Sequence, residues 1–254
     1  MSDKTRLFAE LSYNGTGFHG WQVQPNAITV QEVLDKALST ILREEIETVG
    51  CGRTDTGVHA KQFYAHFDLS NPRPDLSGNP VFLSRLNSLL PPQIAVKQLL
   101  NMAPDAHARF DATLRSYEYH IHFQKDPFKQ NLSWLLRDMP DIDPMNEAAA
   151  LLLHYTDFSC FSKSNTQVFT NNCKISRAEW VNTADGIVFH ISADRFLRNM
   201  VRAIVGTLMM VGKGLLKPAD IHDIIESKNR SNAGSSVPAC GLYLTEVKYP
   251  YFAQ

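Results

Sequence analysis

The chain has 254 residues, 44% hydrophobic and 20% charged, which excludes disordered and fibrous proteins and allows one large domain or two medium-sized ones. Its formal net charge of −1 argues against a nucleic-acid partner unless one face is locally basic, because phosphate contacts require positive charge. No apolar stretch is long enough to span a membrane, and the four cysteines form no C-x-x-C pair, so we expect a cytoplasmic protein with free thiols.

The first part of the chain predicts strands and helices in a regular order. Residues 6–13 alternate as a strand does, and Thr29 with Glu32 forms a capping box that opens a helix ending near Leu42. The later elements are a short strand at 46–50, a strand at 61–69, a helix opened by Pro80 and stopped by Pro91, and a strand at 94–100.

The second part of the chain repeats this order. Its elements are a strand at 114–123, a helix at 144–155, paired strands at 174–182 and 187–193, a long helix at 195–211, a short helix at 218–227 and a closing strand at 242–249.

Strand, helix, strand, strand, helix, strand is the order of a ferredoxin-like domain. We therefore predict an α+β protein of two such halves, residues 1–105 and 106–254, with mostly antiparallel sheets that abut around a central cleft. Clefts of this kind often bind ligands.

A glycine-bracketed loop at 51–60 joins two predicted strands and holds Arg53 and Asp55 at a fixed separation. The spacing allows two interpretations. The loop is either an ordinary turn, in which Asp55 bonds to nearby backbone N–H groups, or a site where another part of the chain desolvates the carboxylate. Similarly, the aromatics of 18–24 are either core residues or a stacking surface for a base.

Arg195, Arg198 and Arg202 recur at i, i+3 and i+7 in the helix predicted at 195–211. They form either a solvated helix face or the local basic surface that the net charge conceals. Tyr117 and Tyr119 share one face of a strand, and each is either a core residue or a surface for a base.

A metal site is a further interpretation of two histidines. His59 and His66 lie across a strand with Asp68 nearby, and a histidine–carboxylate metal site would imply hydrolysis. The other histidines complete no known ligand spacing, so we expect no metal.

Five separated motifs resemble those of the TruA-type tRNA pseudouridine synthases. The most specific is Gly-Arg-Thr-Asp-Thr-Gly-Val-His-Ala at 52–60, where the family usually has Ala in place of Thr56. The N-terminal motif at 13–24 has Asn14 where the family usually has Asp. The other three motifs lie at 115–119, 196–206 and 237–244.

The resemblance implies a role for most of the site residues. Asp55 is the catalytic residue, Arg202 pairs with it and favours its ionised form, and Tyr117 packs on the target base. Arg53 occupies the space that the flipped uridine leaves, and Leu242 lines the base pocket. Apart from the resemblance, the local basic surface predicts that Arg195 and Arg198 bind the substrate.

The implied activity is an isomerase (intramolecular transferase) that converts uridine to pseudouridine at about positions 38, 39 and 40 in the anticodon stem and loop of tRNA, which it reads mainly by shape. It implies a homodimer that uses no metal, nucleotide or other cofactor. Three chemical paths stay open for Asp55, namely attack at ribose C1′, attack at uracil C6, and removal of the C2′ proton. A non-catalytic RNA-binding protein of two ferredoxin-like modules is the alternative function.

Overall fold

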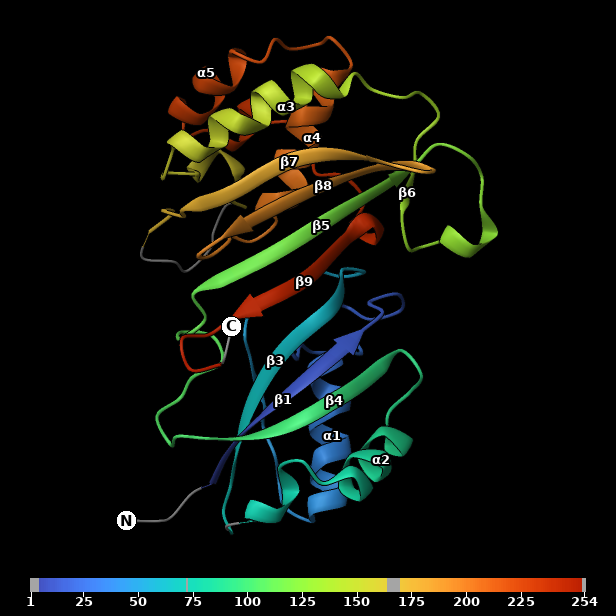
Figure 1. The fold of residues 1–254 in the computed structure, drawn as a ribbon, viewed down its shortest axis with the longest axis vertical. Helices are drawn as coiled ribbons and strands as arrows, with labels where there is room; N and C mark the ends of the chain where they lie inside the picture. Colours follow the sequence, from blue (N-terminus) through green and yellow to red (C-terminus); the bar gives the residue numbers. More distant parts are fainter. Residues whose placement is uncertain (1–4, 72, 164–169, 253–254) are drawn as a thin grey trace. The chain divides into compact units, whose positions relative to one another are not determined.

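The computed structural model describes residues 5–71, 73–163 and 170–252. The chain forms two compact units, which we call the first unit (residues 1–113 and 244–254) and the second unit (residues 114–243). Helices and mostly antiparallel strands occur in both, as expected for a mixed α and β fold (Figure 1). No helix in the described ranges combines the length and apolarity needed to cross a lipid bilayer.

The first unit has a sheet with β1 (Thr5–Tyr13) at its centre. Antiparallel partners flank β1 on both edges, β3 (His59–Leu69) on one and β4 (Ile94–Met102) on the other. The two-residue strand β2 (Val49–Gly50) pairs with β3. Helices α1 (Val30–Leu42) and α2 (Pro80–Leu89) lie next to this sheet (Figure 1).

The buried residues of β1 lie on both faces of the strand, which differs from the one-sided alternation that the sequence suggested. Leu7, Leu11 and also Phe8 are fully buried. Phe8 is covered by rings from the end of the chain, because Tyr249 and Phe252 contact it edge-on with ring centroids 5.7 and 6.4 Å away. The last residues of the chain therefore complete the core of the first unit.

The helix starts of the first unit are those that the sequence predicts. The Thr29 hydroxyl oxygen accepts a hydrogen bond from the backbone N–H of Glu32 at 3.3 Å, which confirms the Thr29 half of the predicted capping box of α1. Asn79 caps α2 by accepting from two backbone N–H groups, and Pro80 occupies the first turn.

The strand expected at 46–50 is shorter than predicted, because side chains of α1 replace its sheet partners. The Ile46 N–H donates to the Ser39 hydroxyl at 2.9 Å, and the Thr48 N–H donates to the Asp35 carboxylate at 3.0 Å. These backbone groups are satisfied without a neighbouring strand.

The second unit has a sheet in which β8 (Gly186–Ala193) lies between β5 (Leu114–His122) and β7 (Ile175–Thr183), antiparallel to both. The short strand β6 (Trp134–Leu135), which we did not predict, runs parallel to β5. Helices α3 (Ile142–Leu151), α4 (Met200–Gly212) and α5 (Asp220–Glu226) belong to this unit, and α3 contacts β7, α4 and α5 (Figure 1). The closing strand β9 (Leu242–Lys248) begins in this unit and continues in the first.

The prediction of one helix from 195 to 211 is wrong at its start, because α4 begins at Met200. Asn199 has a positive φ of 65°, a left-handed conformation that interrupts a helix and that asparagine tolerates. Its side-chain amide donates to the Ser236 hydroxyl at 2.5 Å. Arg195 and Arg198 therefore precede the helix and do not share a helical face with Arg202.

The segment at 230–238 packs closely on α4. A Cβ atom added to Gly206 would lie 1.9 Å from the Ser235 carbonyl oxygen, so only glycine allows this approach. The Thr207 hydroxyl accepts a hydrogen bond from the Gly234 N–H at 2.8 Å and itself donates to the Ala203 carbonyl oxygen. The helix and the segment are thus fixed to each other.

Candidate active site

The loop that connects β2 to β3 carries Asp55, and we call residues 51–58 the Asp55 loop. Its centre is tied to the rest of the first unit through Thr54, which is 8% exposed. The Thr54 hydroxyl hydrogen-bonds the Tyr13 hydroxyl at 2.9 Å, and its carbonyl oxygen accepts from the Trp21 N–H at 3.2 Å. Asp55 follows directly from this fixed residue and is half-buried, whereas Arg53 is exposed.

The segment after β1 packs against the Asp55 loop at backbone distance. Gly20 has a φ of 85°, and a Cβ atom there would lie 2.4 Å from the Thr54 carbonyl oxygen. Phe18 and Trp21 are buried, and the Trp21 ring lies 4.1 Å from that of Phe63. The two aromatics are therefore core residues, and the alternative of a stacking surface for a base is wrong.

The two histidines weighed as metal ligands accept backbone hydrogen bonds. His59 Nδ1 accepts from the Gly15 N–H at 3.0 Å, and His66 Nδ1 accepts from the Ala108 N–H at 3.1 Å. Burial, followed by the nearby Arg6 charge, lowers the pKa of His66 to about 4, so its ring is neutral at pH 7. In the part of the chain that the structure describes, no three or more His, Cys, Asp or Glu residues are grouped to hold a metal ion.

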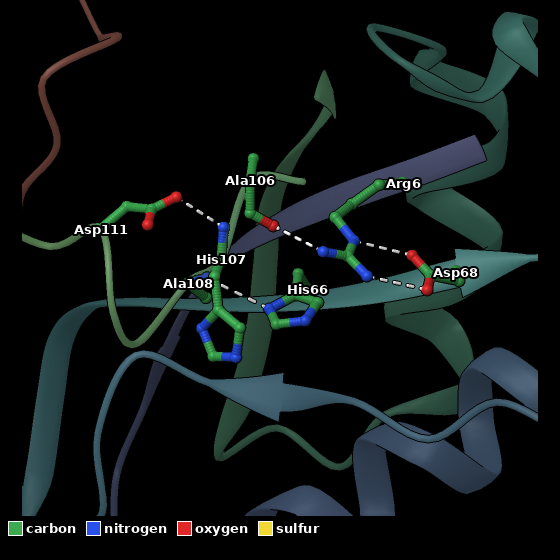
Figure 2. A network of polar contacts seen from close by, with 7 residues as sticks. All are labelled: Arg6, His66, Asp68, Ala106, His107, Ala108 and Asp111. Atoms are coloured by element: carbon green, nitrogen blue, oxygen red, sulfur yellow. Dashed lines mark hydrogen bonds and ion pairs between the residues drawn. The ribbon is translucent and has the colours of Figure 1, made fainter. Parts of the chain in front are cut away.

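A polar network attaches the segment after β4 to strands β1 and β3 (Figure 2). Arg6 forms two hydrogen bonds to the Asp68 carboxylate, at 2.8 and 2.9 Å, and donates a third to the Ala106 carbonyl oxygen at 2.8 Å. The two hydrogen bonds to Asp68 also raise the pKa of Arg6. His66 joins the network through Ala108, so β1 and β3 together hold this segment.

A hollow of about 430 Å³ lies beside the Asp55 loop within the first unit. Its lining is mixed, and the polar residues in it include Gln22, Gln31, Asp35, Arg53 and Arg109. Burial raises the pKa of Asp35 to about 6, although hydrogen bonds from the Thr48 hydroxyl and N–H oppose this shift. We did not predict the hollow, because its residues come from segments far apart in sequence.

The second unit carries the predicted aromatic residues on β5. Tyr117 is half-buried, and its ring stands perpendicular to that of Phe196 with centroids 5.2 Å apart. Tyr119 is fully buried and donates from its hydroxyl to the Pro238 carbonyl oxygen at 2.7 Å. Burial raises the pKa of Tyr119. Tyr119 is thus a core residue, and Tyr117 is the one with an accessible surface.

Arg202 in α4 is oriented by the segment that packs on the helix. Its Nε atom donates to the Val237 carbonyl oxygen at 2.7 Å, and the Val237 N–H donates to the Arg202 carbonyl oxygen at 3.2 Å. Sequence reasoning missed this support, because the partner is a backbone group 35 residues away. Leu242, at the start of β9, is 6% exposed.

The other two arginines of the predicted site lie in the connection between β8 and α4. The Arg195 N–H donates to the Asp194 carboxylate at 2.7 Å, and the Arg198 carbonyl oxygen accepts from the Lys163 N–H at 3.3 Å. Arg198 is exposed and Arg195 is half-buried.

The predicted site residues divide between the two units. Arg53 and Asp55 belong to the first unit, and the remaining ones belong to the second: Tyr117, Arg195, Arg198, Arg202 and Leu242. The pairing of Asp55 with Arg202 joins residues of different units and stays a prediction.

Comparison with known proteins shows similarity over nearly the whole chain. A family model described as tRNA pseudouridine synthase matches residues 148–250. The chain is 50% identical over 246 residues to tRNA pseudouridine synthase A of Parabacteroides distasonis, with 96% of each chain covered. It is 52% identical over 247 residues to tRNA pseudouridine synthase A of Porphyromonas gingivalis. That match covers 96% of this chain and 97% of the relative. The relative of the same name from Bacteroides fragilis is 50% identical, with 96% of each chain covered.

Proposed function

The chain belongs to the tRNA pseudouridine synthase A family, and we propose that it isomerises uridine to pseudouridine at about positions 38, 39 and 40 in the anticodon stem and loop of tRNA. The observation that carries the proposal is the similarity to relatives of that name over 96% of the chain. The resemblance of residues 52–60 to the family's catalytic motif supports an active enzyme.

The reaction is an intramolecular transfer. The bond between uracil N1 and ribose C1′ breaks, the uracil turns, and a bond from C5 to C1′ forms while C5 loses its proton and N1 gains one. Atoms and electrons balance without an external group, so the reaction needs no redox partner or donor. Our proposal therefore assigns all the chemistry to side chains of this chain.

Asp55 is proposed as the catalytic residue. The hydrogen bonds that hold Thr54 support this role, because they fix the backbone from which the Asp55 carboxylate projects. Arg202 is proposed to pair with Asp55 and to favour its ionised form. The hydrogen bond from Arg202 to the Val237 carbonyl oxygen supports this proposal, because it reduces the freedom of the guanidinium.

The other site residues are proposed to bind the substrate. Tyr117 stacks on the target base, as its accessible surface and its edge-on contact with Phe196 allow. Leu242 lines the base pocket, and the exposed Arg53 fills the space that the flipped nucleotide leaves. Arg195 and Arg198 contact phosphates from the connection before α4.

The proposal includes the architecture of the family. We propose two ferredoxin-like halves that meet around the site, near the predicted boundary between residues 1–105 and 106–254. The strand order β4, β1, β3, with β2 on β3, supports this arrangement for the first half. We further propose that the protein acts in the cytoplasm as a homodimer with one tRNA across both subunits.

The test is tritium release from an unmodified tRNA transcript that carries tritium at uracil C5. Wild-type protein should release tritium, since C5 exchanges its proton for a bond to ribose, and Asp55→Asn should not. Transcripts with a single labelled uridine at position 38, 39 or 40 test the proposed positions. Binding of the transcript without release would instead favour the non-catalytic RNA-binding protein.

A further inference from the structure

Gln31 is a polar residue on the buried side of α1, with 8% of its surface exposed. Its carboxamide makes three hydrogen bonds. Oε1 accepts from the Gln22 side chain at 2.9 Å and from the Val23 N–H at 3.1 Å, while Nε2 donates to the Thr48 carbonyl oxygen at 2.6 Å. One side chain thus joins α1, the segment after β1, and the segment before β2.

Both of these segments lead to the Asp55 loop. Thr48 is three residues before the loop, in the stretch where α1 side chains replace sheet partners. Gln22 and Val23 directly follow Trp21, whose N–H donates to the Thr54 carbonyl oxygen. Gln31 therefore fixes the chain that enters the loop and also the segment that holds its centre.

We propose that Gln31 is a positioning residue for Asp55, acting through Thr48 on one side and through residues 21–23 on the other. This inference rests on the proposed function for the role of Asp55. An apolar side chain of similar size would fill the same space, but it would leave the Val23 N–H and the Thr48 carbonyl oxygen without this partner. The amide is thus required for its hydrogen bonds rather than for its volume.

Gln31→Glu tests the hydrogen bonds of residue 31 apart from its packing. The side chain keeps its shape, but an oxygen replaces the Nε2 amide that donates to the Thr48 carbonyl oxygen. The ionised carboxylate can still accept from Gln22 and Val23, but it places negative charge against the Thr48 carbonyl oxygen. The protonated form donates again. We expect single-turnover rates at saturating tRNA to fall about tenfold or more at pH 8 and to recover toward wild type as the pH falls to about 6. The affinity for tRNA should change less than about threefold.

Gln24→Glu is the matched control, since the Gln24 amide also donates to a backbone carbonyl oxygen, that of His19 at 2.7 Å, but is exposed. Its rate should equal that of wild type at each pH. Other charged groups line the same hollow as Gln31, namely Asp35, Glu47, Arg53 and Arg109. They are the same in all three proteins, so the ratio of variant to wild-type rate at each pH isolates residue 31.

Hydrogen exchange tests the same inference without activity. In Gln31→Leu, backbone amides of residues 48–57 should exchange faster than in wild type, while those of β5 should not. A folded Gln31→Glu with wild-type rates at every pH, or a loss of affinity alone, would overturn the proposal, as would unchanged exchange at 48–57. If wild-type protein releases no tritium from tRNA, the proposed function fails, and exchange still decides whether Gln31 positions the loop.

Discussion

Asp35→Asn should stabilise the protein at pH 8 and do so much less at pH 4.5. The pKa of Asp35 is raised from its ordinary value of 3.8 to about 6, first by burial, so ionisation is less favourable in the folded chain than in the unfolded one. For an acid with a raised folded pKa, this cost is absent below about pH 4 and fully present above about pH 6. Removal of the charge should therefore raise the free energy of unfolding by about three times as much at pH 8 as at pH 4.5.

The size of the effect follows from the two pKa values. Their difference corresponds to about 3 kcal/mol at 1.36 kcal/mol per pKa unit, which is an upper bound because Asp35 is only partly buried. The pKa of about 6 already includes the opposing hydrogen bonds from the Thr48 hydroxyl and N–H, and an amide oxygen can accept from both groups. We expect a net gain of about 1–2 kcal/mol in free energy of unfolding at pH 8.

Urea unfolding of wild type and Asp35→Asn at pH 4.5 and 8 measures this difference. Asp138→Asn removes the same charge from an exposed position and serves as the control. An Asp35→Asn protein that is no more stable than wild type at pH 8 would refute the argument that burial of this carboxylate opposes folding.

Three other predictions concern the proposed chemistry and the fold. Asp55→Asn should abolish tritium release while tRNA affinity stays within about threefold, because an amide is neither nucleophile nor base; turnover above background would remove Asp55 from its role. Arg202→Ala should slow single turnover at saturating tRNA more than Arg198→Ala does. Arg198→Ala should mainly weaken tRNA binding. The opposite ranking of the two rates would contradict the proposed pairing of Arg202 with Asp55. Arg6→Ala should lower the free energy of unfolding by about 2–3 kcal/mol in urea titrations. The reason is that Asp68 loses both hydrogen bonds from a guanidinium that is 17% exposed. A change below about 0.5 kcal/mol would show that the network adds little to stability.

Local signals predicted the elements whose ends are determined nearby in sequence. Thr29 caps α1, and Pro80 opens α2, through contacts within three residues. The start of α4 could not be predicted in this way, because Asn199 adopts its left-handed conformation while bonded to Ser236, 37 residues away. The apolar periodicity continues through Asn199, so it extends the expected helix too far.

The candidate site shows the same division. Asp55 and Arg202 were found from motifs that occupy continuous stretches of sequence. The motifs did not reveal the groups that support these two residues. The Val237 carbonyl oxygen bonds Arg202 from 35 positions away, and the Gln31 carboxamide bonds Thr48 from 17 positions away. A backbone carbonyl has no residue type that a motif could record.

The rings that cover Phe8 affect how the protein folds during synthesis on the ribosome. The described part of the first unit includes residues 244–252, but all of the second unit is translated between residue 113 and that segment. At 5–20 residues per second the delay is about 7–26 s. During this time the face of β1 that carries Phe8 lacks Tyr249 and Phe252. We therefore expect the nascent chain to expose an apolar surface, available to chaperones, that the mature fold buries.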